Sequence, residues 1–157
     1  MTLHIDGIPT LKTLVGQRLG ESPWITLDQS LINSFADNTW DHNWIHVSPE
    51  RAKASPFGGT IAHGYHSLAL IGGLIQEVFL IDNLRMALNY GVNKARFPQA
   101  VPVDSRVRLT VDLTDMAEAA DGAADVFYHC VIEIEGSSKP ACAADIIFRY
   151  YPETDPR

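Results

Sequence analysis

The sequence predicts an α+β domain in which one long apolar helix packs against an antiparallel sheet. Three observations support this prediction: an apolar stretch over residues 64–81, four later segments typical of strands, and short turns between those segments. Strands joined by short turns pair antiparallel. A helix that is apolar on nearly all faces is buried, so the two kinds of element should form packed layers.

The N-terminal part is expected to start with a short helix and a strand. The helix covers Leu11–Val15, and the strand ends near Gly20. Thr26 and Gln29 then form a capping-box pattern, which predicts a helix over Leu27–Ala36. Apolar residues that share one face of this helix are Leu31, Ile32 and Phe35.

A further short helix is expected to begin at Ser48. Serine is a good cap, Pro49 suits the first helical position, and Glu50 complements the helix dipole. This helix should end before Pro56, and Phe57–Gly59 should form a turn.

Four strands are expected after the long helix: Arg85–Phe97, interrupted by Gly91, then Arg106–Leu113, Asp125–Glu135 and Ala141–Tyr151. Residues that share a face in the second of these strands are Val107, Leu109, Val111 and Leu113. In the third strand they are Val126, Tyr128, Cys130, Ile132 and Ile134.

Length and composition indicate one globular domain over residues 1–157. The chain is 46% hydrophobic and 20% charged, which is ordinary for a globular protein. The formal net charge of −7 argues against nucleic-acid binding through a basic surface. The apolar run over residues 67–81 includes Gln76 and Glu77 and is too short to span a membrane, so no membrane partner is expected.

Two cysteines, Cys130 and Cys142, both fall in segments predicted as strands. They suit buried thiols in a reducing compartment better than a disulfide framework. No signal-like segment opens the chain, and a cytoplasmic location is therefore expected.

Asp41 and His46 are the first candidates for chemistry. Adding water to an activated double bond requires a group that takes a proton from water and returns one to the neighbouring carbon, and a carboxylate with a neutral imidazole can do both. The alternative is an Asx-turn beside a surface histidine. Trp44 and Ile45 lie between the two residues and should bury the segment, in which case the carboxylate needs a partner.

Gly64 opens the long helix, where backbone amides lack internal acceptors and carry positive partial charge. A thioester carbonyl placed there would be stabilised as negative charge develops on its oxygen. The alternative is a glycine needed only for close packing. Ser67 could hydrogen-bond to Asp41 or to a ligand, although a hydroxyl bonded back to its own helix is the common case.

Four histidines, His42, His46, His63 and His66, raise the question of a metal site. His42 and His46 are four residues apart, but no glutamate completes the zinc-peptidase pattern and no third ligand has a fixed spacing. We therefore expect no metal. His63 and His66 are expected to line or support the mouth of the pocket.

Lys94 and Arg96 have the spacing of one strand face and could bind the phosphates of coenzyme A or of a carrier-protein arm. A solvated strand edge is the alternative. No phosphate loop of the Rossmann or Walker type is present in the sequence.

These residues make the chain resemble the MaoC-like dehydratases, or R-specific enoyl-CoA hydratases, and within them the branch named after nodulation protein N. The hydratase motif corresponds to Asp41, Asn43 and His46, and a later family segment to Phe57-Gly58 and Ile61–Gly64. The segments DHNWIHVSPERA, LNYGVNKARFP and SSKPACAAD are typical of the nodulation-N-like branch. The resemblance covers nearly the whole chain.

The resemblance implies a hot-dog fold, in which a curved antiparallel sheet wraps around one central helix. It also implies that Asp41 and His46 form the catalytic pair, that the Gly64 amide is the oxyanion donor, and that Asn43 shapes the loop or holds the water. An acyl-CoA substrate, no cofactor and a homodimer with sheets joined edge to edge are further implications. Trp40 departs from the family, where a small residue is frequent, and could narrow the acyl tunnel or pack beneath the loop. Trp44 stands where the broader family usually has proline, although tryptophan is usual in the nodulation-N-like branch.

Two functions follow as hypotheses. The first is a hydro-lyase that reversibly hydrates trans-2-enoyl thioesters to (R)-3-hydroxyacyl thioesters. The second is a catalytically silent acyl-thioester binder, or a thioesterase on the same fold, because a fold alone does not determine function.

Overall fold

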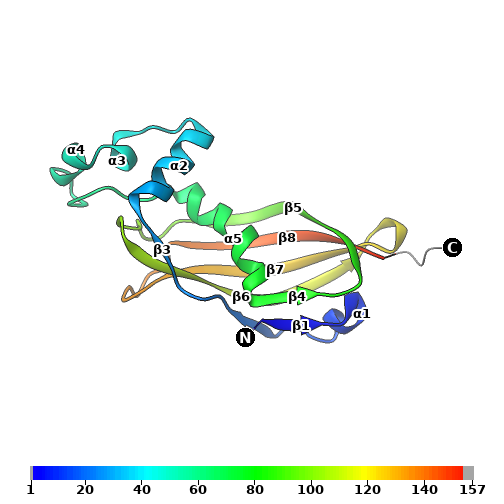
Figure 1. Cartoon of the computed structure of the whole chain (residues 1–157). Helices are drawn as coiled ribbons and strands as arrows, with labels where there is room; N and C mark the ends of the chain where they lie inside the picture. Colours follow the sequence, from blue (N-terminus) through cyan, green and yellow to red (C-terminus); the bar gives the residue numbers. More distant parts are fainter. Residues whose placement is uncertain (1, 154–157) are drawn as a thin grey trace.

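The computed structural model describes residues 2–153 and contains one long helix lying against a six-stranded sheet (Figure 1). In chain order the elements are β1 (Leu3–Ile5), α1 (Gly7–Lys12), β2 (Arg18–Glu21), β3 (Ile25–Leu27), α2 (Gln29–Thr39), α3 (Trp44–Val47), α4 (Pro49–Lys53), α5 (Gly64–Val78), β4 (Phe79–Ile81), β5 (Leu84–Arg96), β6 (Ser105–Glu118), a 3₁₀ turn (Ala120–Gly122), β7 (Ala124–Ile134) and β8 (Cys142–Pro152). None of the helices in residues 2–153 is long and apolar enough to cross a membrane.

The main sheet has the strand order β2-β6-β7-β8-β5, and β3 also pairs with β6. All of these pairs are antiparallel, as the sequence predicts. Strand β5 forms one edge of the sheet, and most of its residues are exposed. This edge is therefore open to a partner.

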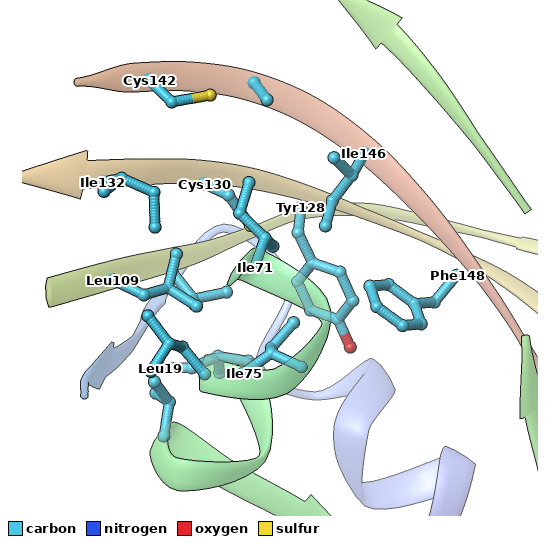
Figure 2. Packing of buried hydrophobic residues seen from close by; sticks show 14 of the residues in the cluster. Leu19, Ile71, Ile75, Leu109, Tyr128, Cys130, Ile132, Cys142, Ile146 and Phe148 are labelled. Carbon is cyan, nitrogen blue, oxygen red and sulfur yellow. The ribbon is translucent and has the colours of Figure 1, made fainter. Parts of the chain in front are cut away.

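The inner face of the sheet and α5 together form the core. Burial alternates strictly along β7, which confirms the predicted face that includes Tyr128 and Ile132. Figure 2 shows Ile71 and Ile75 of α5 close to inward side chains of β6, β7 and β8. The thiols of Cys130 and Cys142 are free and buried, as expected.

The outer face carries complementary polar side chains in register across five strands. Arg18 pairs with Asp112, Asp112 with His129, His129 with Asp145, and Asp145 with Lys94. Hydrogen bonds join the first two residues at 2.8 Å and the His129 ring to Asp145 at 2.7 Å. The sheet therefore has one apolar face and one polar face. A slip of one residue between two strands would exchange these faces, so the register is unique.

Three local predictions about the N-terminal part are wrong. The first helix covers Gly7–Lys12 instead of Leu11–Val15. Thr26 does not cap α2, because it pairs with Arg106 within β3; the Asp28 carboxylate caps the helix by accepting from the Leu31 N–H at 2.9 Å. Leu31 is 45% exposed, whereas Ile32 and Ala36 are buried on the inner face.

The predicted extent and burial of the long helix also need correction. Helix α5 ends at Val78, and Phe79–Ile81 forms β4, which pairs in parallel with β1. One side of α5 is exposed in the single chain. Its exposed residues are Tyr65, Ala69, Gly73, Gln76 and Glu77.

Candidate active site

The candidate catalytic residues lie close together at the start of α5. Helices α2, α3 and α4 extend beyond the end of the sheet and lie around the N-terminal end of α5 (Figure 1). Asp41 and His46 belong to this extension, whereas His63 and Gly64 belong to the start of α5. The fold thus brings together two segments that are about twenty residues apart.

His46 is held in one tautomer by the backbone. The residue is buried in the single turn of α3, and its ring Nδ1 lies 2.6 Å from the carbonyl oxygen of Ile61. A carbonyl can only accept, so Nδ1 carries the proton and Nε2 keeps a free lone pair. Burial lowers the pKa of His46, opposed by the bond to Ile61 and reinforced by His63, so the ring is a neutral base.

Asp41 is exposed, contrary to the expectation that Trp44 and Ile45 bury it. Those two side chains are only half-buried, and Trp40 is 88% exposed, so the carboxylate is left uncovered by residues 2–153. Asp41 Oδ1 accepts from the Asn43 N–H at 3.4 Å.

His63 connects the two segments. Its ring stacks on the His46 ring with 3.7 Å between centroids, and its Nε2 donates to the Asp41 carbonyl oxygen at 2.9 Å. Its Nδ1 is buried and has no hydrogen-bond partner among the described residues. A buried unpaired acceptor of this kind is a place where a donor such as water is expected.

His66 lies one turn further along α5 and stacks on Phe35, with 4.6 Å between ring centroids. Burial lowers the pKa of His66, and His63 adds to the effect. Phe35 also contacts His63, so one aromatic ring supports both histidines.

Asn43 shapes the segment. Its Oδ1 accepts from the Ile45 N–H at 3.4 Å and so caps α3. Ser67 is buried one turn after Gly64, and within residues 2–153 no hydrogen bond joins its hydroxyl to Asp41.

Gly64 is the first residue of α5, a helix of 15 residues. The ring of Phe97, just after β5, lies over it: a Cβ at Gly64 would stand 3.1 Å from two ring carbons. The Phe97 ring therefore lies beside the first turn of α5, where backbone N–H groups have no acceptor within the helix.

Lys94 and Arg96 do not join the cluster. They are paired with Asp145 and Ala143, residues that alternate with the buried Ala144, so both side chains lie on the face opposite α5. Arg96 immediately precedes Phe97, so the two cations border the site from the outer side of β5.

Two polar residues at the site were not predicted as functional. Gln29, at the start of α2, donates to the His46 carbonyl oxygen at 2.7 Å and accepts from the Thr60 hydroxyl at 2.5 Å. A buried threonine next to Ile61 gives no distinctive pattern in the sequence, and Gln29 matches an ordinary capping residue.

Asp41, His46 and His63 each offer a ligand atom within 4.8 Å of the others. Zinc requires nitrogen ligands about 2.0–2.1 Å from the ion and pointing at it. The two imidazoles are stacked with 24° between their planes, so their in-plane lone pairs do not converge on one centre. The cluster suits a water molecule better than a metal ion.

Two neighbouring cavities form a groove along α5 on the side of β5. A cavity of about 200 Å³ includes Leu68 and Val92, and a second of about 420 Å³ extends to Gln76 and Arg85. Residues that both cavities share are Gly72, Asn89 and Phe148. The groove follows the helix away from Gly64.

Comparison with known proteins identifies the family. Residues 10–127 match the MaoC like domain family. The chain belongs to the MaoC-like family. It is 46% identical over 145 residues to 3-hydroxyacyl-thioester dehydratase Z of Mycobacterium tuberculosis, covering 92% of this chain and 96% of that protein. It is 40% identical over 159 residues to nodulation protein N of Rhizobium meliloti, covering 99% of each chain.

Solved structures of MaoC-like proteins and their relatives confirm the hot-dog fold. A monoamine oxidase regulatory protein from Archaeoglobus superposes with a TM-score of 0.79 at 18% identity, covering 98% of this chain and 99% of that chain. The (R)-hydratase of A. caviae superposes with a TM-score of 0.66 at 22% identity, covering 85% and 94%. Family membership and the dehydratase relative place the chain among the hydro-lyases.

Proposed function

We propose that this MaoC-like protein reversibly hydrates trans-2-enoyl thioesters to (R)-3-hydroxyacyl thioesters, with Asp41 and His46 as the catalytic pair. The observation that carries the proposal is the 2.6 Å bond from His46 Nδ1 to the Ile61 carbonyl, which leaves Nε2 as an unprotonated base. An Asp41 carboxylate oxygen lies within 4.8 Å of a His46 ring nitrogen. The 46% identity to a 3-hydroxyacyl-thioester dehydratase supports the reaction class.

In the hydration direction, Asp41 and His46 hold one water molecule beside C3 of the substrate. His46 Nε2 takes a proton from the water as its oxygen bonds to C3. The electrons of the C2–C3 double bond move toward the thioester carbonyl, giving an enolate. The proton then returns to C2, so one whole water molecule has been added. The thioester itself acidifies C2, and no cofactor is required.

The Gly64 amide stabilises the enolate oxygen. Amides in the first turn of a helix have no acceptor within the helix and lie at its positive end. A donor aimed at the oxygen that gains charge lowers the barrier more than one aimed at the resting substrate. In this arrangement Phe97 would pack against the thioester, and Ser67 and His63 would line the site.

The groove between α5 and β5 suits the acyl chain. It begins beside the turn of α5 that follows Gly64, and apolar side chains line its first part. Gly72 leaves room in the middle, since a Cβ there would meet the Asn89 amide at 3.7 Å. The chain would lie in contact with Leu68 and Val92 before it reaches this point.

We also place a homodimer contact at β5 and assign coenzyme A as the carrier. Exposed apolar residues gather along this free edge, which would otherwise invite aggregation. They include Met86, Leu88, Tyr90 and Val92. Lys94 and Arg96 would contact coenzyme A phosphates at the border of the site. The net charge of −7 is unfavourable for an acidic carrier protein, and the buried free thiols of Cys130 and Cys142 fit a cytoplasmic protein.

The test is hydration of crotonyl-CoA and of a medium-chain enoyl-CoA, followed by loss of absorbance of the conjugated thioester. Asp41→Asn should lower kcat by about 10²- to 10⁴-fold, the usual contribution of an acid–base group, with little change in melting temperature. Full activity in this variant would refute the catalytic pair. Tight binding without turnover would indicate a silent binder, and release of free coenzyme A thiol would indicate a thioesterase.

A further inference from the structure

Gln29 lies at the centre of a closed set of hydrogen bonds around His46. Its Nε2 donates to the His46 carbonyl oxygen at 2.7 Å and to Asn33 Oδ1 at 2.9 Å. Its Oε1 accepts from the Thr60 hydroxyl at 2.5 Å. The side chain amide has therefore used both donors and one acceptor position.

The neighbours of Gln29 allow only one orientation of its amide. The His46 carbonyl is an acceptor and requires the nitrogen, whereas the Thr60 hydroxyl can donate to the oxygen. A reversed amide would bring two oxygens together at the His46 carbonyl. The orientation is thus a consequence of the network.

This network includes both groups that hold His46 in place, one at its ring and one at its backbone. The ring of His46 is held by the Ile61 carbonyl, while the backbone of His46 is held by Gln29. Gln29 in turn holds Thr60, the residue just before Ile61. Gln29 therefore helps to fix the separation between the His46 backbone and the carbonyl that orients its ring.

The segment that carries Ile61 is itself fixed to the body of the protein. Thr60 is only 2% exposed, and its carbonyl accepts from the Val103 N–H at 2.9 Å. The Ala62 N–H also donates to the Val101 carbonyl at 2.9 Å, whereas the Ile61 N–H donates to the Ile45 carbonyl of α3 at 3.0 Å. The Gln29 side chain and the Ile61–Ile45 bond thus together tie the extension formed by α2, α3 and α4 to a firmly held segment.

We infer that Gln29 and Thr60 are positioning residues for the hydration reaction, because they hold the His46 backbone and the residue before Ile61, whose carbonyl selects the tautomer of the His46 ring. The inference rests on the proposed function, in which His46 Nε2 is the base. Small displacements of a base are costly, since a misplacement of about 1 Å can lower a rate by about 10²-fold.

Gln29→Glu is the sharpest test, because it keeps the shape and the acceptor for Thr60 but replaces the two donors with an oxygen. We expect kcat to fall by about 10- to 100-fold while KM changes less than about threefold. Thr60→Val should lower kcat less, and Thr60→Ser should restore it because the hydroxyl returns. In the double variant Gln29→Glu/Thr60→Val, the fold decrease in kcat should be smaller than the product of the decreases in the two single variants, since the two residues act in one network.

Asn33→Ala provides the matched control. It removes the third hydrogen bond of Gln29 on an exposed part of α2 but leaves the bonds to His46 and Thr60. Activity of this variant should equal that of wild type. A loss as large as that of Gln29→Glu would show that general damage to α2 is responsible, and would overturn the inference.

A second readout does not depend on activity. Nitrogen NMR of the His46 ring should show the Nδ1–H tautomer in wild type and in Asn33→Ala, and a mixture of tautomers in Gln29→Glu. Unchanged tautomer and unchanged kcat in Gln29→Glu, with Asp41→Asn inactive, would refute the positioning role and leave the proposed function standing. A wild-type protein without hydratase activity would refute the proposed function instead, while the NMR result would still decide what Gln29 does to His46.

Discussion

The body of the protein and the extension formed by α2, α3 and α4 are held together by different means. The body depends on alternation of apolar residues: β7 and β8 bury every second side chain along most of their length, and β6 buries Val107, Leu109, Val111 and Leu113 on the same inner face. The extension has few fully buried apolar side chains within the described residues, chiefly Ile32, Ala36 and Ala52. It depends instead on specific hydrogen bonds, such as those of Gln29, Asn43 and His46.

This difference suggests that the body provides most of the stability, whereas the extension holds the groups needed for chemistry. Apolar packing is tolerant of sequence, whereas a hydrogen bond requires particular atoms at particular distances. A reaction that needs one imidazole nitrogen free and aimed at water requires the second kind of support. The comparison can be tested by changing each region in turn.

The largest effect on stability should come from the body. Leu109→Ala removes a fully buried side chain from the centre of β6. We expect the free energy of unfolding to fall by about 2–5 kcal/mol, the usual cost of such a cavity. Activity per folded molecule should remain near that of wild type, as measured by denaturant titration beside steady-state assays. A loss of kcat with an unchanged free energy of unfolding would contradict the assignment of stability to the body and of chemistry to the extension.

The junction of the two regions is tested by Gly64→Ala. The new methyl group would lie 3.1 Å from the Phe97 ring, so the ring must move away from the helix N-terminus. We expect kcat to fall by about tenfold, less than the full loss of an oxyanion donor, because the amide remains.

Gly73→Ala is the control for this helix, since it has the same chemistry and no atom within 4 Å of the added methyl group. It should raise stability by up to about 1 kcal/mol through helix propensity and leave kcat unchanged. If both alanine variants lose activity equally, the specific role of Gly64 is wrong.

The extension should also respond to pH through His46. Because burial lowers the pKa of His46, the ring stays neutral below the ordinary histidine value of about 6.5. The acid limb of kcat/KM should therefore have its midpoint below about 6.5, with a fall of up to about tenfold per pH unit beyond it. A midpoint above this value, or a His46 ring that titrates there by NMR, would contradict the assignment.

The same shift makes the folded state sensitive to acid. The unfolded chain takes up a proton near pH 6.5, whereas folded His46 and His66 resist it. Stability is therefore fully present above about pH 6.5 and declines as the pH falls from there toward the lowered folded pKa. Thermal melts across this range provide the measurement.

The smallest effect is expected at Trp40, which caps α2 in the left-handed region at φ 62° although it is not glycine. Glycine adopts this conformation without strain, so Trp40→Gly should raise the free energy of unfolding by up to about 1 kcal/mol. Trp40→Ala keeps the strain and removes the ring, and it should give no such gain. Equal melting temperatures for the two variants would show that the backbone strain is negligible.

Much of the body was predictable because its signal is local. A strand places alternate residues on opposite faces, so Val126, Tyr128 and Ile132 could be assigned to one face from spacing alone. The parallel pair β1–β4 could not, since it joins residues 3–5 to residues 79–81. Lys94 and Arg96 share a face as predicted, but only the pairing of β5 with β8 decided which face it is.

The sequence by itself determined the residue types of the candidate site and the family to which the chain belongs. Asp41, Asn43, His46 and Gly64 are recognisable because their spacing along the chain is fixed. Only the tertiary structure decided that the Ile61 carbonyl selects the tautomer of His46, that Gln29 joins His46 to Thr60, and that Asp41 is exposed. The physical reason is that a hydrogen bond between residues 15 to 31 positions apart depends on how the whole chain closes, and no local pattern specifies that closure.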